Sequence, residues 1–302
     1  MPVPDYEQML ARLQSAFESL PDKPEETPEG VLRALWCLAA GDPRSLESAA
    51  TAELAELDGA QLEQLGGYIE RYHNAVPLAH MTGRHNFCGL ELLTSADALI
   101  PRKETGVLAA AALEIIGQVE TGTPVVVDAC TGCGNLALLF AHHYPEARVF
   151  GADLSESALQ LARRNAEYTG MDGRVEFLQG DLLAPFAGEA FAKKIDVLSC
   201  NPPYISSQKV PQMHREIADH EPSMAFDGGP FGISILNKLI RDAVNYIKPG
   251  GYLVFELGLG QGESMLKLIG RNAGYSHVEG REDESGNIRA IVARVGTGEG
   301  AV

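Results

Sequence analysis

From residue 124 onward, short apolar segments typical of strands alternate with segments of helical spacing. Repeated strand–helix–strand units form a mostly parallel sheet with helices on both faces, because parallel neighbours need a crossover connection. The last two strand-like segments follow each other closely enough to pair antiparallel. The expected strands lie at 125–128, 147–153, 174–179, 195–200, 252–257, 275–279 and 288–295. The sequence therefore predicts an α/β fold.

The N-terminal quarter of the chain has a different character. Apolar residues recur there at helical spacing, and breaks such as Asp58-Gly59 separate the pieces. Residues 1–76 are expected to form a helical bundle, which is a candidate substrate-recognition domain. Residues 77–100 are expected to form a linker with a β-hairpin, and residues 101–302 the α/β domain.

Composition limits the class of protein. The 302 residues are 45% apolar and 22% charged, as in globular proteins, and the net charge is −17. Such an acidic chain is a poor partner for nucleic acid phosphates. No apolar run approaches the roughly 20 residues of a membrane span, and the N-terminus lacks a signal-peptide layout. We expect a cytoplasmic protein without membrane contact, and the sequence leaves its oligomeric state open.

A glycine-containing loop follows the first strand. Asp128 ends this strand, and Cys130, Thr131, Gly132 and Gly134 lead into the next helix. Glycine lets the backbone turn sharply and approach a ligand closely. The spacing also matches the dinucleotide fingerprint Gly-x-Gly-x-x-Ala, which keeps an NAD-dependent reductase as an alternative.

Acidic residues stand at three successive strand ends. They are Asp128, Asp153 (followed by Leu154) and Asp181 (followed by Leu182). Ligands of open α/β sheets bind at the carboxyl ends of the strands, where these carboxylates would gather. An ammonium, a ribose diol and an adenine amino group would each find an acceptor there. This set fits S-adenosylmethionine better than a pyrophosphate.

The run Asn201-Pro202-Pro203-Tyr204 ends an apolar strand, because neither proline can donate a ladder hydrogen bond. The Asn201 side-chain carbonyl and the Pro202 backbone carbonyl can accept hydrogen bonds, and Tyr204 offers a flat surface. These groups suit a planar nitrogen group. The run contains no acid or base for hydride chemistry, so we expect methyl transfer to nitrogen, driven by positioning.

The pair Cys130-x-x-Cys133 has two alternative interpretations. A redox pair of the thioredoxin type sits at a similar strand-to-helix turn, and a zinc site would need a second pair of ligands. Neither alternative explains Asp153, Asp181 or Asn201. We interpret both cysteines as small residues lining the loop, and we expect no metal. The five cysteines in the chain do not suggest a disulfide framework.

Together these motifs resemble the class I S-adenosylmethionine-dependent glutamine N5-methyltransferases, whose members act on peptide-chain release factors. The resemblance covers roughly residues 30–295 and includes further segments. These are 77–83, Phe87, Gly89, 100–105, Asn165, Glu221-Pro222, 227–229, Gly232, 248–251, Glu256 and Gln261-Gly262. The resemblance implies a Rossmann-like class I methyltransferase fold with an antiparallel last strand in a seven-stranded sheet. It also implies a small N-terminal helical domain and S-adenosyl-L-methionine as cofactor.

The resemblance also implies a set of site residues. Asn201, Pro202 and Tyr204 would be catalytic, and Pro203, Phe87 and Glu221 would join them in binding the substrate. The cofactor-binding set would be Arg102, Glu104, Thr105, Asp128, Cys130, Thr131, Gly132, Gly134, Asp153, Leu154, Asp181, Leu182 and Asn201.

The chain departs from the family pattern at a few positions. Its loop reads Cys130-Thr131-Gly132-Cys133-Gly134 where the family usually has Gly-Thr-Gly-Ser-Gly. Lys103 and Gly106 replace a usual proline and acid. The expected substrate is the glutamine amide of a release factor. A small-molecule nitrogen, such as an amino-acid amide or the guanidine of arginine, is the alternative.

Overall fold

The structure is a computed structural model, and it describes residues 5–20, 23–120, 122–208, 210, 215–230 and 232–297. The chain divides into two compact units. The first comprises Met1–Lys103 with Met213–Glu221, and the second comprises Glu104–Gln212 with Pro222–Val302. The segment 213–221 thus belongs to a unit whose other residues lie more than a hundred positions earlier in the sequence.

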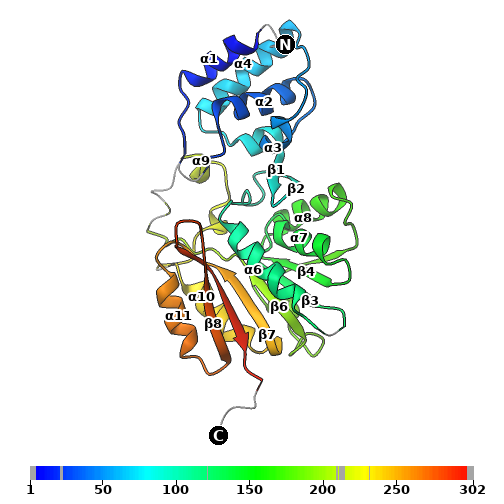
Figure 1. Ribbon diagram of the computed structural model, residues 1–302, viewed down its shortest axis with the longest axis vertical. Coiled ribbons are helices and arrows are strands. Elements are labelled where there is room, and N and C mark those ends of the chain that lie inside the picture. The colour runs from blue at the N-terminus through cyan, green and yellow to red at the C-terminus, as the bar shows by residue number, and fades with distance from the viewer. Residues whose placement is uncertain are drawn as a thin grey trace. The chain divides into compact units, whose positions relative to one another are not determined.

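The first unit is mainly helical. Its elements are α1 (Tyr6–Gln14), α2 (Pro28–Ala39), α3 (Leu46–Ala50), α4 (Gly59–His73), α5 (Leu78–Thr82), the hairpin strands β1 (Arg84–Phe87) and β2 (Leu90–Leu93), and α9 (Arg215–Ala218) (Figure 1). The core surrounds Trp36, which is fully buried with Leu32, Leu35 and Leu65. The predicted hairpin is present, with β1 and β2 antiparallel.

One helical region differs from the prediction. Two amphipathic pieces were expected around Asp58-Gly59, but only α4 forms there. The Asp58 side chain accepts a hydrogen bond from Gln61 N, and the Gln61 side-chain oxygen accepts one from Asp58 N. This capping box fixes the helix start. Leu54 and Leu57 precede it without helical structure, although they also pack on the core. Helix α5 was not predicted.

The second unit contains a seven-stranded sheet with the order β5-β4-β3-β6-β7-β9-β8. Its elements are α6 (Thr105–Gly117), β3 (Val125–Ala129), α7 (Asn135–His143), β4 (Arg148–Asp153), α8 (Glu156–Tyr168), β5 (Val175–Gln179), η1 (Ala184–Phe186), β6 (Ile195–Cys200), η3 (Ser223–Ala225), α10 (Ser234–Ala243), β7 (Ile247–Glu256), α11 (Gly262–Gly270), β8 (Tyr275–Glu282) and β9 (Ile288–Val295). Strand β9 is antiparallel to both of its neighbours, and the other pairings are parallel. The predicted fold class is confirmed.

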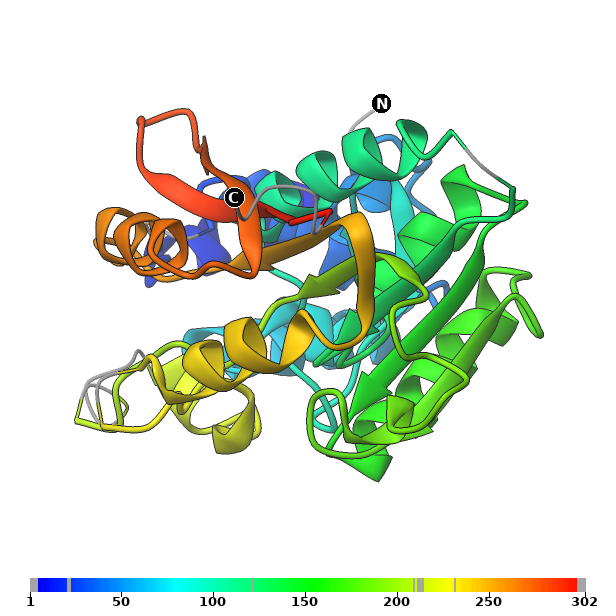
Figure 2. The same cartoon turned by 90° about the horizontal axis from the view of Figure 1, so that it is seen from below.

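Strand alternation separates apolar and polar residues. Val127, Leu198 and Phe255 lie in a buried cluster with residues of α10 and α11. Because successive side chains of a strand point to opposite faces, Asp128, Ser199 and Glu256 belong to the other face. Helix α6 lies on one side of the sheet and α10 on the other (Figure 2). The face opposite α10 therefore carries buried polar groups.

Strand β7 begins earlier than the sequence predicts. It was expected from 252, but it starts at Ile247 and pairs there with Ile195. The register then shifts, since Val197 pairs with Tyr252. Gly250, with φ of +81°, lies within this irregularity. Glycine adopts this left-handed conformation without a steric penalty, so the strand bulges instead of ending.

Candidate active site

The loop after β3 is built from left-handed residues. Cys130, Gly132 and Gly134 have φ of +58°, +54° and +84°. A Cβ at Gly134 would lie 3.1 Å from Ala162 Cβ, so the loop packs closely on α8 there. A Cβ at Gly132 would meet no atom within 4 Å. The loop is therefore tightly packed where it enters α7 and opens to free space at Gly132.

Cys130 is the unusual residue of this loop. A non-glycine residue in the left-handed region costs roughly 1–2 kcal/mol. The residue before Cys130, Ala129, pairs with Cys200 at the end of the neighbouring strand β6. Cys133 is buried, and its Sγ lies 3.9 Å from Asn135 Oδ1. All five cysteines are free, so Cys130 and Cys133 do not form a disulfide.

Asp128 joins the loop to the sheet. It is fully buried, Oδ2 accepts a hydrogen bond from Thr131 Oγ1 (2.6 Å), and Oδ1 accepts one from Ser199 Oγ (2.7 Å). Burial raises the pKa of this carboxyl group to about 7. Both oxygens thus have protein partners, and a direct contact with a ligand ammonium stays a prediction.

Asp153 lies beside the loop, where the sequence placed it. Its Oδ2 accepts a hydrogen bond from Gly132 N (2.9 Å), and its Oδ1 accepts one from Ser155 N (2.9 Å). Burial raises the pKa of this carboxyl group. The next residue, Leu154, is 55% exposed, which is unusual for a large apolar side chain. The structure therefore brings together the glycine loop, an acid and an uncovered apolar surface.

Asp181 has a partner that the sequence analysis missed. Its carboxylate pairs with the Lys238 ammonium on helix α10. Leu182 is buried and has φ of +51°. Asp181, Leu182 and Lys238 also line a cavity of about 200 Å³. The predicted contact between Asp181 and an adenine amino group is untested and would require the carboxylate to leave or share Lys238.

Each end of the run Asn201–Tyr204 has a side-chain partner on another element. Asn201 Nδ2 donates to Thr105 Oγ1 (3.2 Å) at the start of α6. Tyr204 Oη donates to Glu256 Oε1 (2.9 Å). The other oxygen, Glu256 Oε2, is buried and has no hydrogen-bond partner among the described residues. Asn201 Oδ1 also has no donor among the residues that the structure describes.

Two glycines and a glutamine contact the backbone of the run Asn201–Tyr204. A Cβ on Gly228 would lie 2.6 Å from Pro203 O, and one on Gly232 would lie 2.2 Å from Tyr204 O. Only glycine permits such close approach. Gln261 Nε2 also donates to Tyr204 O (3.2 Å). These contacts fix the path of the chain immediately after Asn201.

Glu256 is the acid that accepts the hydrogen bond of the Tyr204 hydroxyl. It is fully buried at the end of β7, and burial raises its pKa to about 7. Arg289 Nη2 lies 4.0 Å from Glu256 Oε1 and 3.5 Å from Glu104 Oε1. Glu104, a predicted cofactor-binding residue, thus faces an arginine. These contacts place Glu104, Thr105 and Glu256 in one cluster with Asn201.

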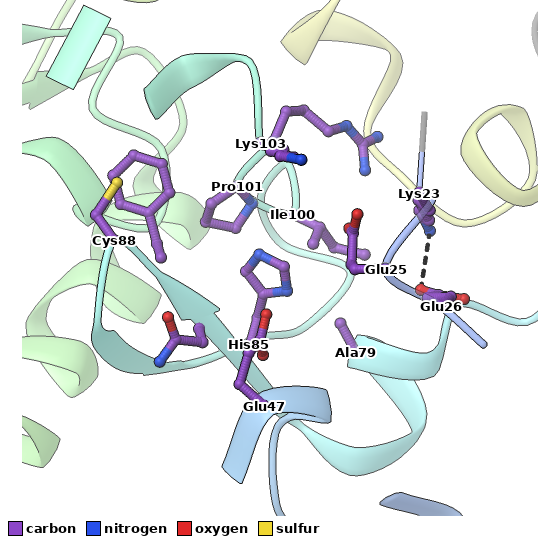
Figure 3. A pocket seen from close by; sticks show the side chains of 13 residues that line it. Lys23, Glu25, Glu26, Glu47, Ala79, His85, Cys88, Ile100, Pro101 and Lys103 are labelled. Atoms are coloured by element: carbon purple, nitrogen blue, oxygen red, sulfur yellow. Dashed lines mark ion pairs between the residues drawn. The ribbon is translucent and has the colours of Figure 1, made fainter. Parts of the chain in front are cut away.

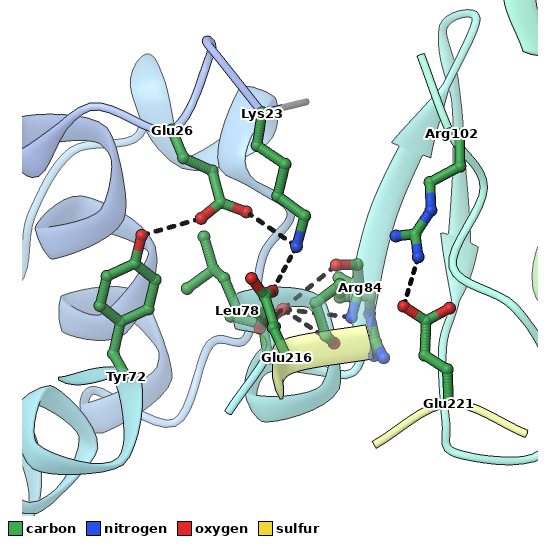
Figure 4. A network of polar contacts seen from close by, with 10 residues as sticks. Lys23, Glu26, Tyr72, Leu78, Arg84, Arg102, Glu216 and Glu221 are labelled. Atoms are coloured by element: carbon green, nitrogen blue, oxygen red, sulfur yellow. Dashed lines mark hydrogen bonds and ion pairs between the residues drawn. The ribbon is translucent and has the colours of Figure 1, made fainter. Parts of the chain in front are cut away.

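Three other predicted site residues lie in the first unit. Arg102 and Glu221 pair with each other, and Glu221 Oε2 also accepts a hydrogen bond from Ile100 N (3.1 Å) (Figure 4). Phe87 is buried and, together with Arg102, lines a cavity of about 260 Å³. Any contact of Arg102 with cofactor, or of Phe87 and Glu221 with substrate, stays a prediction.

This cavity is rich in charged groups of both signs. Lys23, Glu25, Glu26, Glu47 and His85 are among the residues that line it (Figure 3). Burial lowers the pKa of His85 to about 4, so its ring is neutral near pH 7. Lys23 pairs with Glu216 of α9 and lies 3.8 Å from Glu26, whose other contact is the Tyr72 hydroxyl (Figure 4). This network ties α9 to the helical core.

Comparison with known proteins identifies the family. A model described as a methyltransferase domain matches residues 121–269. A release factor glutamine methyltransferase of Moorella thermoacetica is 36% identical over 225 residues, which are 74% of this chain and 77% of that one. A release factor glutamine methyltransferase of Mycobacterium leprae is 33% identical over 295 residues, which are 95% of this chain and 98% of that one. The chain belongs to the release factor glutamine methyltransferase family. The NAD-dependent reductase is thereby set aside.

Solved structures agree on the fold of this methyltransferase. The catalytic domain of hMettl16 superimposes with a TM-score of 0.54 at 14% identity, covering 71% of this chain and 78% of that one. A human methyltransferase 10 domain containing protein superimposes with a TM-score of 0.50 at 17% identity. The superposition covers 69% of this chain and 89% of that one. At these identities the likeness concerns the fold alone. The described part of the methyltransferase contains no helix long and apolar enough to cross a membrane.

Several residues that contact the predicted site residues had no predicted role. They are Ser199, Lys238, Glu256, Gln261 and Arg289. Glu256 had a usable signal, because it ends an apolar strand as Asp128 and Asp153 do. The contacts of the other four residues could not be predicted without knowing the register of the sheet and the positions of the helices.

Proposed function

We propose that this methyltransferase transfers a methyl group from S-adenosylmethionine to the side-chain amide nitrogen of a glutamine in a peptide-chain release factor. The observation that carries the proposal is the orientation of the Asn201 amide. Its Nδ2 is used by Thr105, so its Oδ1 is left to accept an N–H from a planar nitrogen. The names of the relatives support the substrate.

The residues around the loop fit the cofactor. Gly132 opens to free space, Asp153 lies beside it, and the exposed Leu154 offers an apolar surface. Asp153 would bind the ribose hydroxyls. Cys130 and Thr131 would line the loop, and Leu182 would contribute apolar contact near the adenine. When bound, S-adenosylmethionine supplies an electrophilic methyl group.

The chain's own groups would act by positioning. An amide nitrogen is a poor nucleophile because its lone pair is delocalised. Asn201 Oδ1 and the Pro202 carbonyl would accept its two hydrogens, which orients the nitrogen and stabilises the positive charge that develops. Near-attack geometry of this kind contributes roughly 7–11 kcal/mol at best. Tyr204 would pack on the planar group while its hydroxyl stays on Glu256.

The helical first unit is our candidate for recognition of the protein substrate. Its charged cavity includes Phe87 and Arg102, which were predicted to bind substrate and cofactor. A protein substrate of translation would place the reaction in the cytoplasm. The alternative substrate is a small-molecule nitrogen, and the experiment below distinguishes it from a release factor.

To test the proposal, the enzyme is incubated with an intact release factor and S-adenosylmethionine labelled in its methyl group. Parallel reactions contain free glutamine, free arginine, or a release factor whose acceptor glutamine is replaced by alanine. We expect one methyl group on one glutamine of the release factor, located by mass spectrometry. Label on a free amino acid, with none on the release factor, would refute the proposed substrate.

A further inference from the structure

We propose that Gln261 is a positioning residue, whose side-chain amide holds the backbone of the run Asn201–Tyr204 in the geometry that methyl transfer needs. This inference deepens the proposed function and rests on it. Gln261 directly precedes helix α11, in the turn that follows strand β7. Its amide makes three hydrogen bonds to backbone groups, one through its oxygen and two through its nitrogen.

The first step is the direction of the Gln261 amide. Gly258 N lies 2.8 Å from Gln261 Oε1, and a backbone N–H can only donate. Tyr204 O and Gly232 O lie 3.2 and 3.4 Å from Gln261 Nε2, and a backbone carbonyl can only accept. The three partners therefore allow one orientation of the amide, in which both hydrogens of its nitrogen are used.

The second step is the set of segments that this amide joins. Tyr204 belongs to the run after β6, Gly232 precedes α10, and Gly258 lies in the turn after β7. Along the chain, Gln261 is 57 residues from Tyr204 and 29 residues from Gly232. One side chain thus connects the ends of two neighbouring parallel strands with the segment that leads into α10.

The third step is the environment of Tyr204. A Cβ on Gly258 would lie 3.1 Å from Tyr204 Cδ2, so the turn after β7 packs on the tyrosine ring. Glu256 Oε1 accepts the hydrogen bond of the Tyr204 hydroxyl (2.9 Å). Residues 256–261 therefore contact Tyr204 at its hydroxyl, its ring and its carbonyl.

The run itself transmits a displacement of Tyr204. Pro202 and Pro203 have φ angles fixed by their rings, which makes this part of the backbone stiff. A shift of the Tyr204 carbonyl therefore also moves the Pro202 carbonyl and the Asn201 amide, the two groups that would accept the hydrogens of the substrate nitrogen. Gln261 touches neither substrate nor cofactor in this scheme and acts through Tyr204.

Gln261→Glu tests this with a small change of shape. The new carboxylate can still accept from Gly258 N, but it has no N–H for the carbonyls of Tyr204 and Gly232 and repels them. We expect kcat for release-factor methylation to fall by roughly 10- to 10²-fold, as when reacting groups are displaced by about 1 Å. The Kd for S-adenosylhomocysteine, measured by calorimetry, should change far less.

Thermal stability separates positioning from a merely structural role. A carboxylate at the N-terminus of α11 interacts favourably with the helix dipole, which offsets part of the loss of the two hydrogen bonds. We therefore expect Gln261→Glu to remain folded at the assay temperature while its turnover is low. Gln261→Met, which keeps the length of the side chain without its polar groups, should also lower kcat.

Gln61→Glu is the matched control. Gln61 Oε1 accepts a hydrogen bond from Asp58 N (2.9 Å), three residues earlier, as Gln261 Oε1 does from Gly258 N. This bond belongs to the capping box of α4, and a carboxylate can also accept it. Gln61→Glu should keep the turnover of the wild type. Equal turnover in Gln261→Glu and Gln61→Glu would overturn the inference.

A spectroscopic readout tests the contact with Tyr204 independently of activity. In protein labelled with ¹³C-carbonyl tyrosine and ¹⁵N-isoleucine, only Tyr-Ile pairs give carbonyl–nitrogen correlations. The sequence has three such pairs, at 68–69, 204–205 and 246–247. The Tyr204 signal is identified by its loss in Tyr204→Phe. It should shift in Gln261→Glu, while the other two signals keep their positions.

An unmoved Tyr204 signal in Gln261→Glu would overturn the role of Gln261. Failure of the proposed function gives a different result, because the wild-type enzyme would then methylate no release factor, whatever the position of the Tyr204 signal.

Discussion

At the scale of single residues, the most specific prediction concerns the effect of Asn201→Ala on turnover. Asn201→Ala removes the acceptor at Oδ1 and also leaves Thr105 Oγ1 without its donor. We expect turnover to fall by about 10²–10³-fold, as when one preorganised hydrogen-bonding group is lost from an active site. The affinity for S-adenosylhomocysteine should change far less. A variant with near wild-type turnover would remove Asn201 from the mechanism.

Asp153 gives a second expectation at this scale. Its carboxylate holds Gly132 N and Ser155 N and is the candidate ligand of the ribose. Hydrogen bonds to a charged group contribute about 1.5–3 kcal/mol each, so Asp153→Ala should weaken S-adenosylhomocysteine binding by more than about tenfold. Calorimetry measures this. Asp172→Ala, an exposed acid in the loop after α8, controls for the loss of charge. Equal affinities of the two variants would exclude Asp153 from the site.

At the scale of elements, Gly228 and Gly232 support the run Asn201–Tyr204 by close backbone contact. Gly232→Ala should sharply reduce turnover, because the new Cβ would lie 2.2 Å from Tyr204 O and displace the run. Gly286→Ala is the matched control in the turn between β8 and β9. It has a similar φ (+77° against +69°), and its Cβ would meet no atom within 4 Å.

Both glycine variants carry the same left-handed strain of roughly 1–2 kcal/mol. Their difference in thermal stability and turnover therefore measures the contact with the backbone of Tyr204 and Ser206. Similar turnover in the two variants would show that the run does not depend on this segment.

At the scale of the whole molecule, buried acids should shape the dependence of stability on pH. Asp128 and Glu256 have pKa values of about 7 in the folded protein, against 3.8 and 4.5 for the ordinary groups. Between these limits the folded state keeps protons that the unfolded state releases. Stability contributed by these groups is therefore present below about pH 4 and is lost as pH rises towards 7.

Asp128→Asn should remove part of this slope. The loss of unfolding free energy between pH 5 and pH 8 should be smaller in the variant than in the wild type, by up to about 1.4 kcal/mol per pH unit below 7. Urea unfolding at several pH values measures this, with exposed Asp172→Asn as control. An unchanged slope would mean that Asp128 does not titrate in this range.

Much of the fold could be read from local patterns. Each βα unit carries its own apolar strand, turn and helix, so strands such as Ile195–Cys200 were placed correctly from a few neighbouring residues. The same holds for Gly132 and Asp153, because a strand-to-helix turn and the end of the next parallel strand always meet at one edge of the sheet. Family membership likewise follows from motifs spread along the chain.

Only the tertiary structure decided how the side chains pair. The sequence alone determined that Asn201 follows a buried strand and offers a carbonyl, but an amide can point either way. Its direction depends on Thr105, which lies 96 residues earlier and reaches Asn201 because α6 packs on β6. The same reason explains the pairing of Asp181 with Lys238 and of Arg102 with Glu221. Hydrogen-bond direction is a property of partners, and distant partners meet only when the chain folds.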